Sequence, residues 1–585
     1  MASSLVDGNS ILAVDVGAAN TRAVMFDVVE GEYRFVASGI APSTAEAPVK
    51  DVSEGVRNAI INLQTILGKS LLDDSRDLIT PSQPNGSGVD GLVVTISAGP
   101  PIKAAVVGLL KDVSLESARK LTESTYARVV ETLSLNDRRK PDQQIDALLR
   151  VQPDLIVVTG GTDGGASRSI QKLLEPIGLA GFILPKEKLP AILYAGNEKV
   201  AEDIKSLIGS FASVLHLSPN VRPSLETEDL EPAKHELARM VVNVRKRQIK
   251  GVDVLDLWSG GHMLPTAYAT GRMVRFLSKV YSTEKGILSI DLGASAAVIS
   301  AGFKDKSTLN VYPQFGLGEN LAGLLNYTTL GDILRWSPLD ISEGVLRDYL
   351  YQKSLYPSTI AATKEDFAIA QSVARQVLYL AMQSARRDFP RNVPHIKQSL
   401  SPLFDPILAG GGALSDAARP GYGLLLLLDT LQPVGVTTVI LDQNNLLPLL
   451  GVAAAQNNIL PVQVIESGAF LSVGTVVVPV VSAHYGTPIL RATLTYANGS
   501  EARVDLKFGG LESLPLSSGE SGKLTIQCLR GADIGFGPGR GGTIPVTGGA
   551  LGVVFDGRGR PLDLPSDPVR RRELIKKWNW TLGGE

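Results

Sequence analysis

The chain has 585 residues, of which 44% are hydrophobic and 20% charged, and its net charge is -2. An intrinsically disordered chain would have fewer apolar residues and a larger net charge, so the composition indicates a folded protein of several domains. A nearly neutral chain has no general positive field for nucleic acid or for an anionic membrane, so neither is expected as a partner.

Cysteine content and apolar runs exclude further classes of protein. The single cysteine, Cys528, rules out a disulfide framework and a Cys-based zinc site. Residues 1–4 lack the basic and apolar segments of a signal peptide. The longest apolar stretches, such as residues 424–428, are far shorter than the roughly 18 residues of a membrane-spanning helix. We therefore expect a soluble, cytoplasmic protein.

The N-terminal part, residues 1–90, has the pattern of a small sheet with one helix. Apolar runs at 11–14, 23–28 and 33–37 are separated by short turns, which predicts an antiparallel meander. Apolar residues then recur at helical spacing over 51–67. A polar stretch rich in Ser, Pro, Asn and Gly follows and indicates a surface loop.

Residues 91–285 alternate between strand and helix patterns, which is typical of a parallel α/β unit. Strands are predicted over 91–97, 155–159 and 191–194, and helices over 115–132, 167–174, 199–207 and 229–249. We expect this segment to be an inserted α/β subdomain.

The pattern starts again at residue 286, and residues 286–461 are predicted to form a further unit. It contains a strand–glycine–strand segment at 286–300, strands at 407–409 and 437–441, and a small-residue helix at 447–456. Alternating Val and Thr with frequent glycines predict a β-rich C-terminal domain over 462–585, closed by a short helix at 568–578.

Two segments of the chain echo each other. Residues 11–17 match residues 287–293, and both are apolar strands that end in Asp-x-Gly, at Asp15 and Asp291. A glycine turn lets backbone N–H groups approach a phosphate, and a carboxylate beside it suits hydrated Mg²⁺. Two such hairpins would clamp a phosphate chain, and the strand ending in Gly410-Gly411-Gly412 suits the close approach of a nucleoside.

This order of motifs resembles the actin, heat-shock-70 and sugar-kinase ATPase superfamily. The first phosphate loop of that superfamily is matched by Asp15, Gly17, Asn20, Thr21 and Arg22, the second by Asp291, Gly293 and Ser295, the adenosine motif by Gly410, Gly411 and Gly412, and the second connecting helix by 448–455. The resemblance implies an α/β protein with two actin-like (ribonuclease H-like) lobes that binds ATP and Mg²⁺, with Asp15 and Asp291 as catalytic and metal-holding residues.

A narrower resemblance lies within that superfamily. The motifs G-G-T-D-G-G at 160–165 and Y-A-G-N at 194–197 are similar to those of the MutL-type accessory component of glutamate mutase, over about residues 11–460. That resemblance implies an ATP-dependent, chaperone-like factor that reactivates or assembles an adenosylcobalamin-dependent mutase. Its expected partner is a protein, and a homo-oligomer is a further expectation.

The second phosphate loop departs from the family pattern D-I-G-G-A-T-T-D. The last three positions are Ala296, Ala297 and Val298, which removes two hydroxyls and a carboxylate that could bind phosphate or position water. Three alternatives follow: an ATPase, a non-hydrolysing actin-like scaffold (a pseudo-ATPase), and a small-molecule kinase. The kinase needs an acidic general base, for which Asp163 is the candidate.

Overall fold

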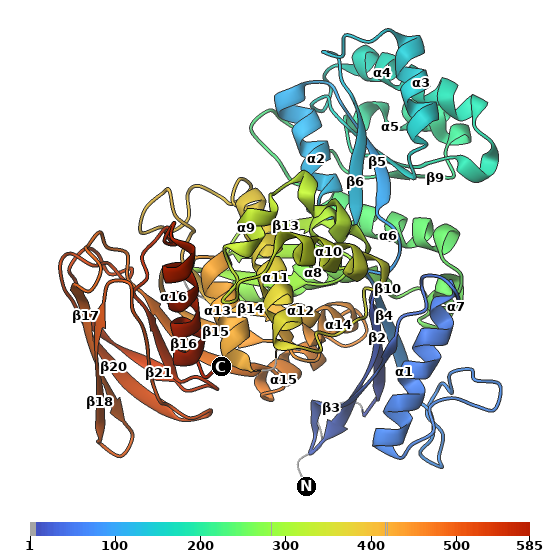
Figure 1. The fold of residues 1–585 in the computed structure, drawn as a ribbon. Coiled ribbons are helices and arrows are strands. Elements are labelled where there is room, and N and C mark those ends of the chain that lie inside the picture. Colours follow the sequence, from blue (N-terminus) through green and yellow to red (C-terminus); the bar gives the residue numbers. More distant parts are fainter. Residues whose placement is uncertain (1–7, 282–283, 416, 418, 585) are drawn as a thin grey trace.

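The computed structural model describes residues 8–281, 284–415, 417 and 419–584, so the prediction about residues 1–4 lies outside the described part. Figure 1 shows a central body with the insert above it on one side and the C-terminal strands on the opposite side. The described strands form four sheets, of five, eight, four and five strands. Two of these sheets, one of five strands and the one of eight, contain the segments 11–17 and 287–293 whose sequences resemble each other.

The first lobe is the predicted meander with two further strands. β1 (Ile11–Val16), β2 (Asn20–Val29) and β3 (Glu32–Pro42) are antiparallel neighbours, which confirms the meander. β4 (Gly91–Ile96) lies parallel to the other edge of β1, followed by β10 (Met263–Pro265). The predicted helix is confirmed as α1 (Val52–Leu67), which begins where the Asp51 side chain accepts from the backbone of Ser53.

The second lobe repeats this arrangement strand by strand. Its strands are β11 (Gly286–Leu292), β12 (Ala297–Phe303), β13 (Lys306–Tyr312), β14 (Phe404–Gly410) and β15 (Gly435–Leu441). In both lobes the first strand is antiparallel to the second and parallel to the fourth, so both sheets have the order 3-2-1-4-5. The sequence echo is therefore a structural duplication.

Two helices join the lobes by packing on each other between the sheets. They are α8 (Thr266–Val280), which follows β10, and α14 (Leu446–Ala453), which follows β15. A Cβ atom at Gly451 would lie 2.1 Å from the Ala269 carbonyl oxygen, so the close crossing of these helices requires a glycine there. The second-lobe face away from this contact carries α9 (Leu330–Leu334), α10 (Glu343–Leu355), α11 (Lys364–Ala385), α12 (Gly412–Ser415) and α13 (Pro420–Thr430).

The insert is a separate five-stranded sheet in which every neighbouring pair is parallel, as predicted. Its strands, in spatial order, are β6 (Ala127–Leu133), β5 (Ile102–Gly108), β7 (Leu155–Thr159), β8 (Ala191–Tyr194) and β9 (Val214–Leu217). Its helices are α2 (Glu116–Thr122), α3 (Pro141–Val151), α4 (Ser167–Ile183), α5 (Ala201–Ile208) and α6 (Glu231–Gln248), with α7 (Val252–Trp258) after them.

Two sequence predictions about the insert are wrong. The boundaries 91–285 are too wide, because β4 and β10 pair within the first-lobe sheet and α8 joins the lobes. The helix expected over 115–132 ends at Thr122, and its second half is the strand β6. β-Branched Val129 and Val130 favour a strand, and there they extend the parallel sheet.

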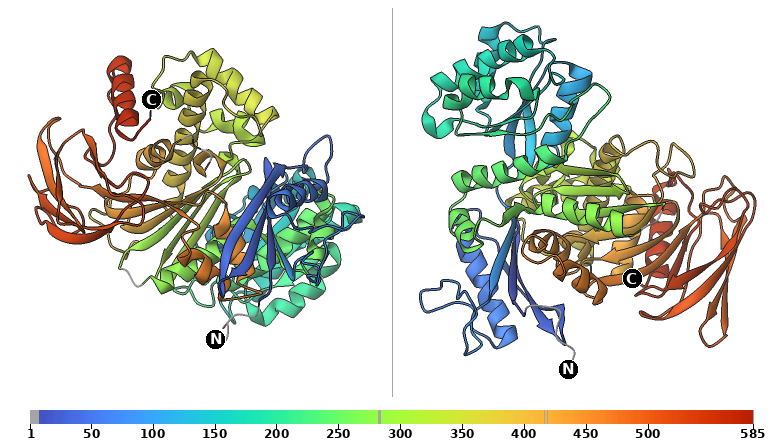
Figure 2. Two further views of the ribbon diagram at one scale, coloured as in Figure 1. Left: turned by 90° about the horizontal axis from the view of Figure 1, so that it is seen from below. Right: turned by 180° about the vertical axis from the view of Figure 1, so that it is seen from behind.

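The C-terminal region is β-rich, as predicted, but residues 462–585 are not an independent domain. After α15 (Leu460–Glu466), the strands β16 (Leu471–Val478), β22 (Val553–Asp556) and β19 (Leu511–Leu514) continue the second-lobe sheet to eight strands. A second sheet of β17 (Pro488–Tyr496), β18 (Glu501–Lys507), β20 (Ser521–Cys528) and β21 (Gly542–Thr547) packs against this extension (Figure 2). The closing helix is α16 (Pro568–Thr581), which packs on the second-lobe core.

Candidate functional site

A cavity of about 430 Å³ lies between the two lobes, at the ends of the duplicated hairpins. The turn after β1 and the turn after β11 both line it, and they have the same backbone hydrogen bond. Gly17 N–H donates to the Asn20 carbonyl at 3.1 Å, and Gly293 N–H donates to the Ala296 carbonyl at 3.1 Å. The two predicted phosphate turns therefore face one cavity.

Asp15 is a buried carboxylate held from three sides. Thr95 lies beside it on β4 and donates to Oδ1 at 2.6 Å, and Thr266 at the start of α8 donates to the same oxygen at 2.9 Å. Asn445, from the second lobe, donates to Oδ2 at 2.7 Å. Burial raises the pKa of Asp15, and these hydrogen bonds oppose the rise because they stabilise the ionised form.

Asp291 differs from Asp15, since no hydrogen bond from the described residues reaches its carboxylate. Burial, together with the negative charges of Asp15 and Asp442, raises the pKa of Asp291 to about 7. Gly411 lies against it: a Cβ there would be 2.4 Å from Asp291 Oδ1, and the backbone has φ +86°. The third glycine motif thus lies against the second carboxylate.

Most residues predicted for the site line this one cavity: Asp15, Gly17, Asn20, Arg22, Asp291, Gly293, Ser295, Gly411 and Gly412. Thr21 and Gly410 do not. Thr21 is fully buried, and its hydroxyl has no partner among the described residues, so it does not face the cavity as a phosphate donor would. Gly410 ends β14 next to Asp442.

The departure in the second turn has a structural counterpart. Ala296 and Val298 are buried in an apolar cluster with Tyr126, Ala267, Leu309 and Val311. Hydrocarbon therefore occupies the positions at which the family pattern has a hydroxyl and a carboxylate. Tyr126 comes from the insert, and burial beside Asp291 and Asp15 raises its pKa well above the usual value.

Sequence reasoning missed the residues that surround the two carboxylates. Thr95 and Thr266 are hidden because only strand pairing places them at Asp15: β4 pairs with β1, and β10, which leads into Thr266, pairs with β4. Asp442 and Asn445 did have a signal, since a strand that ends in Asp before a helix is a typical cap. Asp442 accepts from the backbone of Leu446 at 2.8 Å and of Leu447 at 2.7 Å, which starts α14.

The candidate kinase base lies elsewhere. Asp163 Oδ1 accepts from Asn220 Nδ2 at 2.9 Å and from the backbone of Glu198 at 3.2 Å, within the insert. It does not line the cavity between the lobes. The small-molecule kinase therefore loses its only proposed general base.

Within the described ranges, no three or more His, Cys, Asp or Glu side chains gather as they would around a metal ion. Among the helices that the structure describes, none combines the length and the apolar character needed to span a bilayer.

Two lobes with the same 3-2-1-4-5 sheet, joined by crossing helices and enclosing paired Asp-x-Gly turns, define the actin-like (ribonuclease H-like) ATPase fold. The family model described as MutL protein matches residues 11–468. The chain belongs to this MutL family, which confirms the resemblance read from its motifs.

Individual relatives are distant. The protein MutL of Clostridium tetanomorphum is 22% identical over 357 residues, which cover 56% of this chain and 73% of that one. A nucleotide-free diol dehydratase-reactivating factor covers 79% of this chain and 100% of its own, at 11% identity and TM-score 0.30. A glycerol dehydratase reactivase covers 77% and 100%, at 12% identity and TM-score 0.28. The fold assignment rests on the sheet order and not on these two matches.

Proposed function

We propose that this protein is an ATP- and Mg²⁺-binding, chaperone-like accessory factor that acts on a protein partner. The observation that carries the nucleotide site is the pair Asp15 and Asp291, which lie beside two turns with the same backbone hydrogen bond in one cavity. Asp291 lacks a hydrogen-bond donor among the described residues, and its pKa is raised to about 7. A divalent cation would remove that unfavourable negative charge.

The residues present fit Mg²⁺, which takes one or two carboxylates and keeps several waters. Asp291 would hold the ion, and Asp15, fixed by Thr95, Thr266 and Asn445, would orient its water shell. Bound Mg²⁺ supplies charge neutralisation for the phosphates. The backbone N–H groups of the two turns would bind phosphate oxygens, and Gly411 and Gly412 would allow the nucleoside to approach closely.

The partner that we propose is an adenosylcobalamin-dependent mutase, on the ground of membership in the MutL family. The protein would open and close its lobes around nucleotide and transmit the change to the mutase.

The second candidate function is a non-hydrolysing scaffold, and the apolar cluster around Ala296 and Val298 favours it. In that case the bound nucleotide would stabilise a closed conformation of the two lobes and would dissociate without being hydrolysed. Both candidates share the binding site and differ in turnover.

Calorimetry with Mg-ATP, with phosphate release followed in the same samples, tests the proposal. Wild type is expected to bind, and both Asp15→Asn and Asp291→Asn are expected to lose affinity by about tenfold or more. Asp505→Asn, on the exposed face of β18, is the matched control and should bind like wild type. Turnover supports an ATPase, and binding without turnover supports the scaffold. Equal binding by all four proteins would reject the site.

A further inference from the structure

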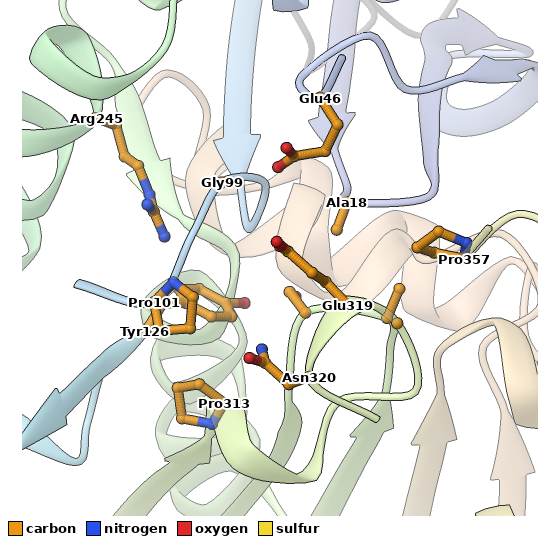
Figure 3. Close-up of a pocket in the computed structure, with 13 residues that line it drawn as sticks. Ala18, Glu46, Gly99, Pro101, Tyr126, Arg245, Pro313, Glu319, Asn320 and Pro357 are labelled. Carbon is orange, nitrogen blue, oxygen red and sulfur yellow. The ribbon is translucent and has the colours of Figure 1, made fainter. Parts of the chain in front are cut away.

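A smaller pocket of about 30 Å³, drawn in Figure 3, adjoins the cavity between the lobes. The two cavities share five residues: Ala18 of the first turn, Ala294 and Ser295 of the second turn, Tyr126, and Pro357. The other walls come from three parts of the molecule: Glu46 of the first lobe, Gly99, Pro101 and Arg245 of the insert and its connection, and Pro313, Gly318, Glu319 and Asn320 of the second lobe. At this point the insert meets both phosphate turns.

Arg245 of α6 is the unusual residue in this pocket. It is 1% exposed, and its Nη1 donates to the Pro100 carbonyl at 2.6 Å and to Gln248 Oε1 at 2.7 Å. Its Nη2 is buried without a partner among the described residues. A buried guanidinium group with unused donors is unfavourable until an acceptor reaches it, and burial lowers the pKa of Arg245.

No side chain in the described part of the pocket supplies that acceptor. Glu46 and Glu319 point toward the same space in Figure 3, and the charge of Glu46 acts on Arg245, but among the described residues neither glutamate forms an ion pair with Arg245. Both glutamates lie at the exposed mouth, and burial together with the charge of Glu319 raises the pKa of Glu46. Nη2 of Arg245 therefore remains an unsatisfied hydrogen-bond donor on the inner wall of the pocket.

The neighbouring cationic groups are already engaged. Arg22 and Lys353 are the other Lys or Arg side chains that line the two cavities in the described ranges. Arg22 Nη1 donates to the Gln443 carbonyl at 2.9 Å, and Lys353 Nζ donates to the Thr359 carbonyl at 2.5 Å. Of these three cationic side chains, Arg245 is the one with a buried nitrogen, Nη2, that has no partner among the described residues.

We propose that Arg245 is a ligand of the terminal phosphate of a nucleoside triphosphate held between the two turns. The planar guanidinium fork of arginine matches phosphate oxygens, and such charged hydrogen bonds are strong. We infer that a diphosphate held by the same two turns stops one phosphate short of the pocket, so that Arg245 would distinguish ATP from ADP. This inference rests on the proposed nucleotide site and adds to it a sensor that belongs to the insert.

The same residue is tied to the connection between the first lobe and the insert. Residues 97–101 link β4 to β5, and Arg245 is bonded to Pro100 in that link. Gly99 has φ +103°, and a Cβ there would lie 2.8 Å from Arg245 Nη1, so the bend follows the guanidinium group closely. Contact with a terminal phosphate would therefore act directly on the segment that carries the insert.

The test measures the dissociation constants of Mg-AMP-PNP and Mg-ADP by calorimetry. Arg245→Gln should bind AMP-PNP about tenfold or more weakly and ADP within about twofold of wild type. Arg247→Gln is the matched control: it lies on the same helix, bonds two backbone carbonyls (Leu189 and Glu187), and does not line either cavity. It should change neither constant.

Arg245→Lys covers the case in which Arg245→Gln does not fold, since it keeps the charge but loses the fork. It should weaken AMP-PNP several-fold and spare ADP. Equal weakening of both nucleotides, or unchanged AMP-PNP affinity in a folded variant, would overturn the sensor while leaving the nucleotide site intact. If wild type binds neither nucleotide, the proposed function itself fails.

Discussion

At the scale of single residues, Asp291 makes stability depend on pH. Its pKa is raised to about 7 in the folded protein, whereas an unfolded Asp titrates near 4. The folded state thus holds this proton more tightly, so its contribution to stability is present at low pH and is lost as pH rises from about 4 to about 7. Without metal, Asp291→Asn should be more stable than wild type by about 1–2 kcal/mol at pH 8 and by only about a third of that at pH 5.

Thermal melts in EDTA at both pH values measure this difference in stability. The contributions of other titrating groups cancel because both proteins contain them. An Asp291→Asn variant that is less stable than wild type at pH 8 would contradict the prediction.

Mg²⁺ should have the opposite pH dependence, because it competes with the proton for Asp291. Added Mg²⁺ is expected to raise the melting temperature of wild type at pH 8, and much less at pH 5. Asp291→Asn should show little response at either pH. The same melts at Mg²⁺ concentrations that differ tenfold measure this effect, and NaCl at matched ionic strength serves as the control. An equal Mg²⁺ response in wild type and variant would place the ion elsewhere.

At the scale of elements, the crossing of α8 and α14 holds the two lobes together. A Cβ at Gly451 would lie 2.1 Å from the Ala269 carbonyl oxygen, so Gly451→Ala must push the helices apart. We expect a loss of about 1–3 kcal/mol, as in other overpacked cores. Gly423→Ala in α13 is the matched control, since the nearest atom there lies 3.5 Å away and alanine favours a helix by up to about 1 kcal/mol. Melting temperatures of both variants test this, and a neutral Gly451→Ala would reject the close crossing.

The sequence predicted elements best where one local pattern decides them. The meander, α1 and the parallel strands β7 and β8 have clear periodicity and turn residues. The sequence-based predictions were wrong where strand pairing decides the structure. Residues 127–133 form a strand because β5 offers them an edge. β4 belongs to the first lobe because it pairs with β1, and no pattern within residues 91–96 indicates that pairing.

The site follows the same rule. Asp15 and Asp291 could be predicted because strand, carboxylate and glycine are contiguous in the chain. Thr95, Thr266 and Arg245 could not, since each comes from a segment that only the tertiary fold brings to the turns. Thr21 was predicted from its motif position, but strand alternation turns its side chain into the core.

At the scale of the whole molecule, a buried ion network connects the cleft to the C-terminal strands. Arg375 of α11 donates to Asp429 Oδ2 at 2.8 Å, and Arg558 donates to Asp429 Oδ1 at 2.6 Å. Arg558 and Arg560 also bond Asp556 at the end of β22. Arg375 in turn bonds Gln371, which lines the cleft. The β-rich region is therefore attached to the helix that forms one wall of the cavity between the lobes.

Asp429→Ala should loosen this attachment, because it leaves two buried guanidinium groups without their shared carboxylate. Breaking a buried pair in this way costs about 3–5 kcal/mol, so we expect a large fall in melting temperature and earlier protease cleavage within residues 471–556. Asp505→Ala is the control: its partner Arg491 is 61% exposed, and surface pairs contribute about 0–1 kcal/mol. Limited proteolysis with and without Mg-ATP measures both effects. If the C-terminal strands stay protected in Asp429→Ala, the network does not hold them, and the shared sheet through β16 alone does.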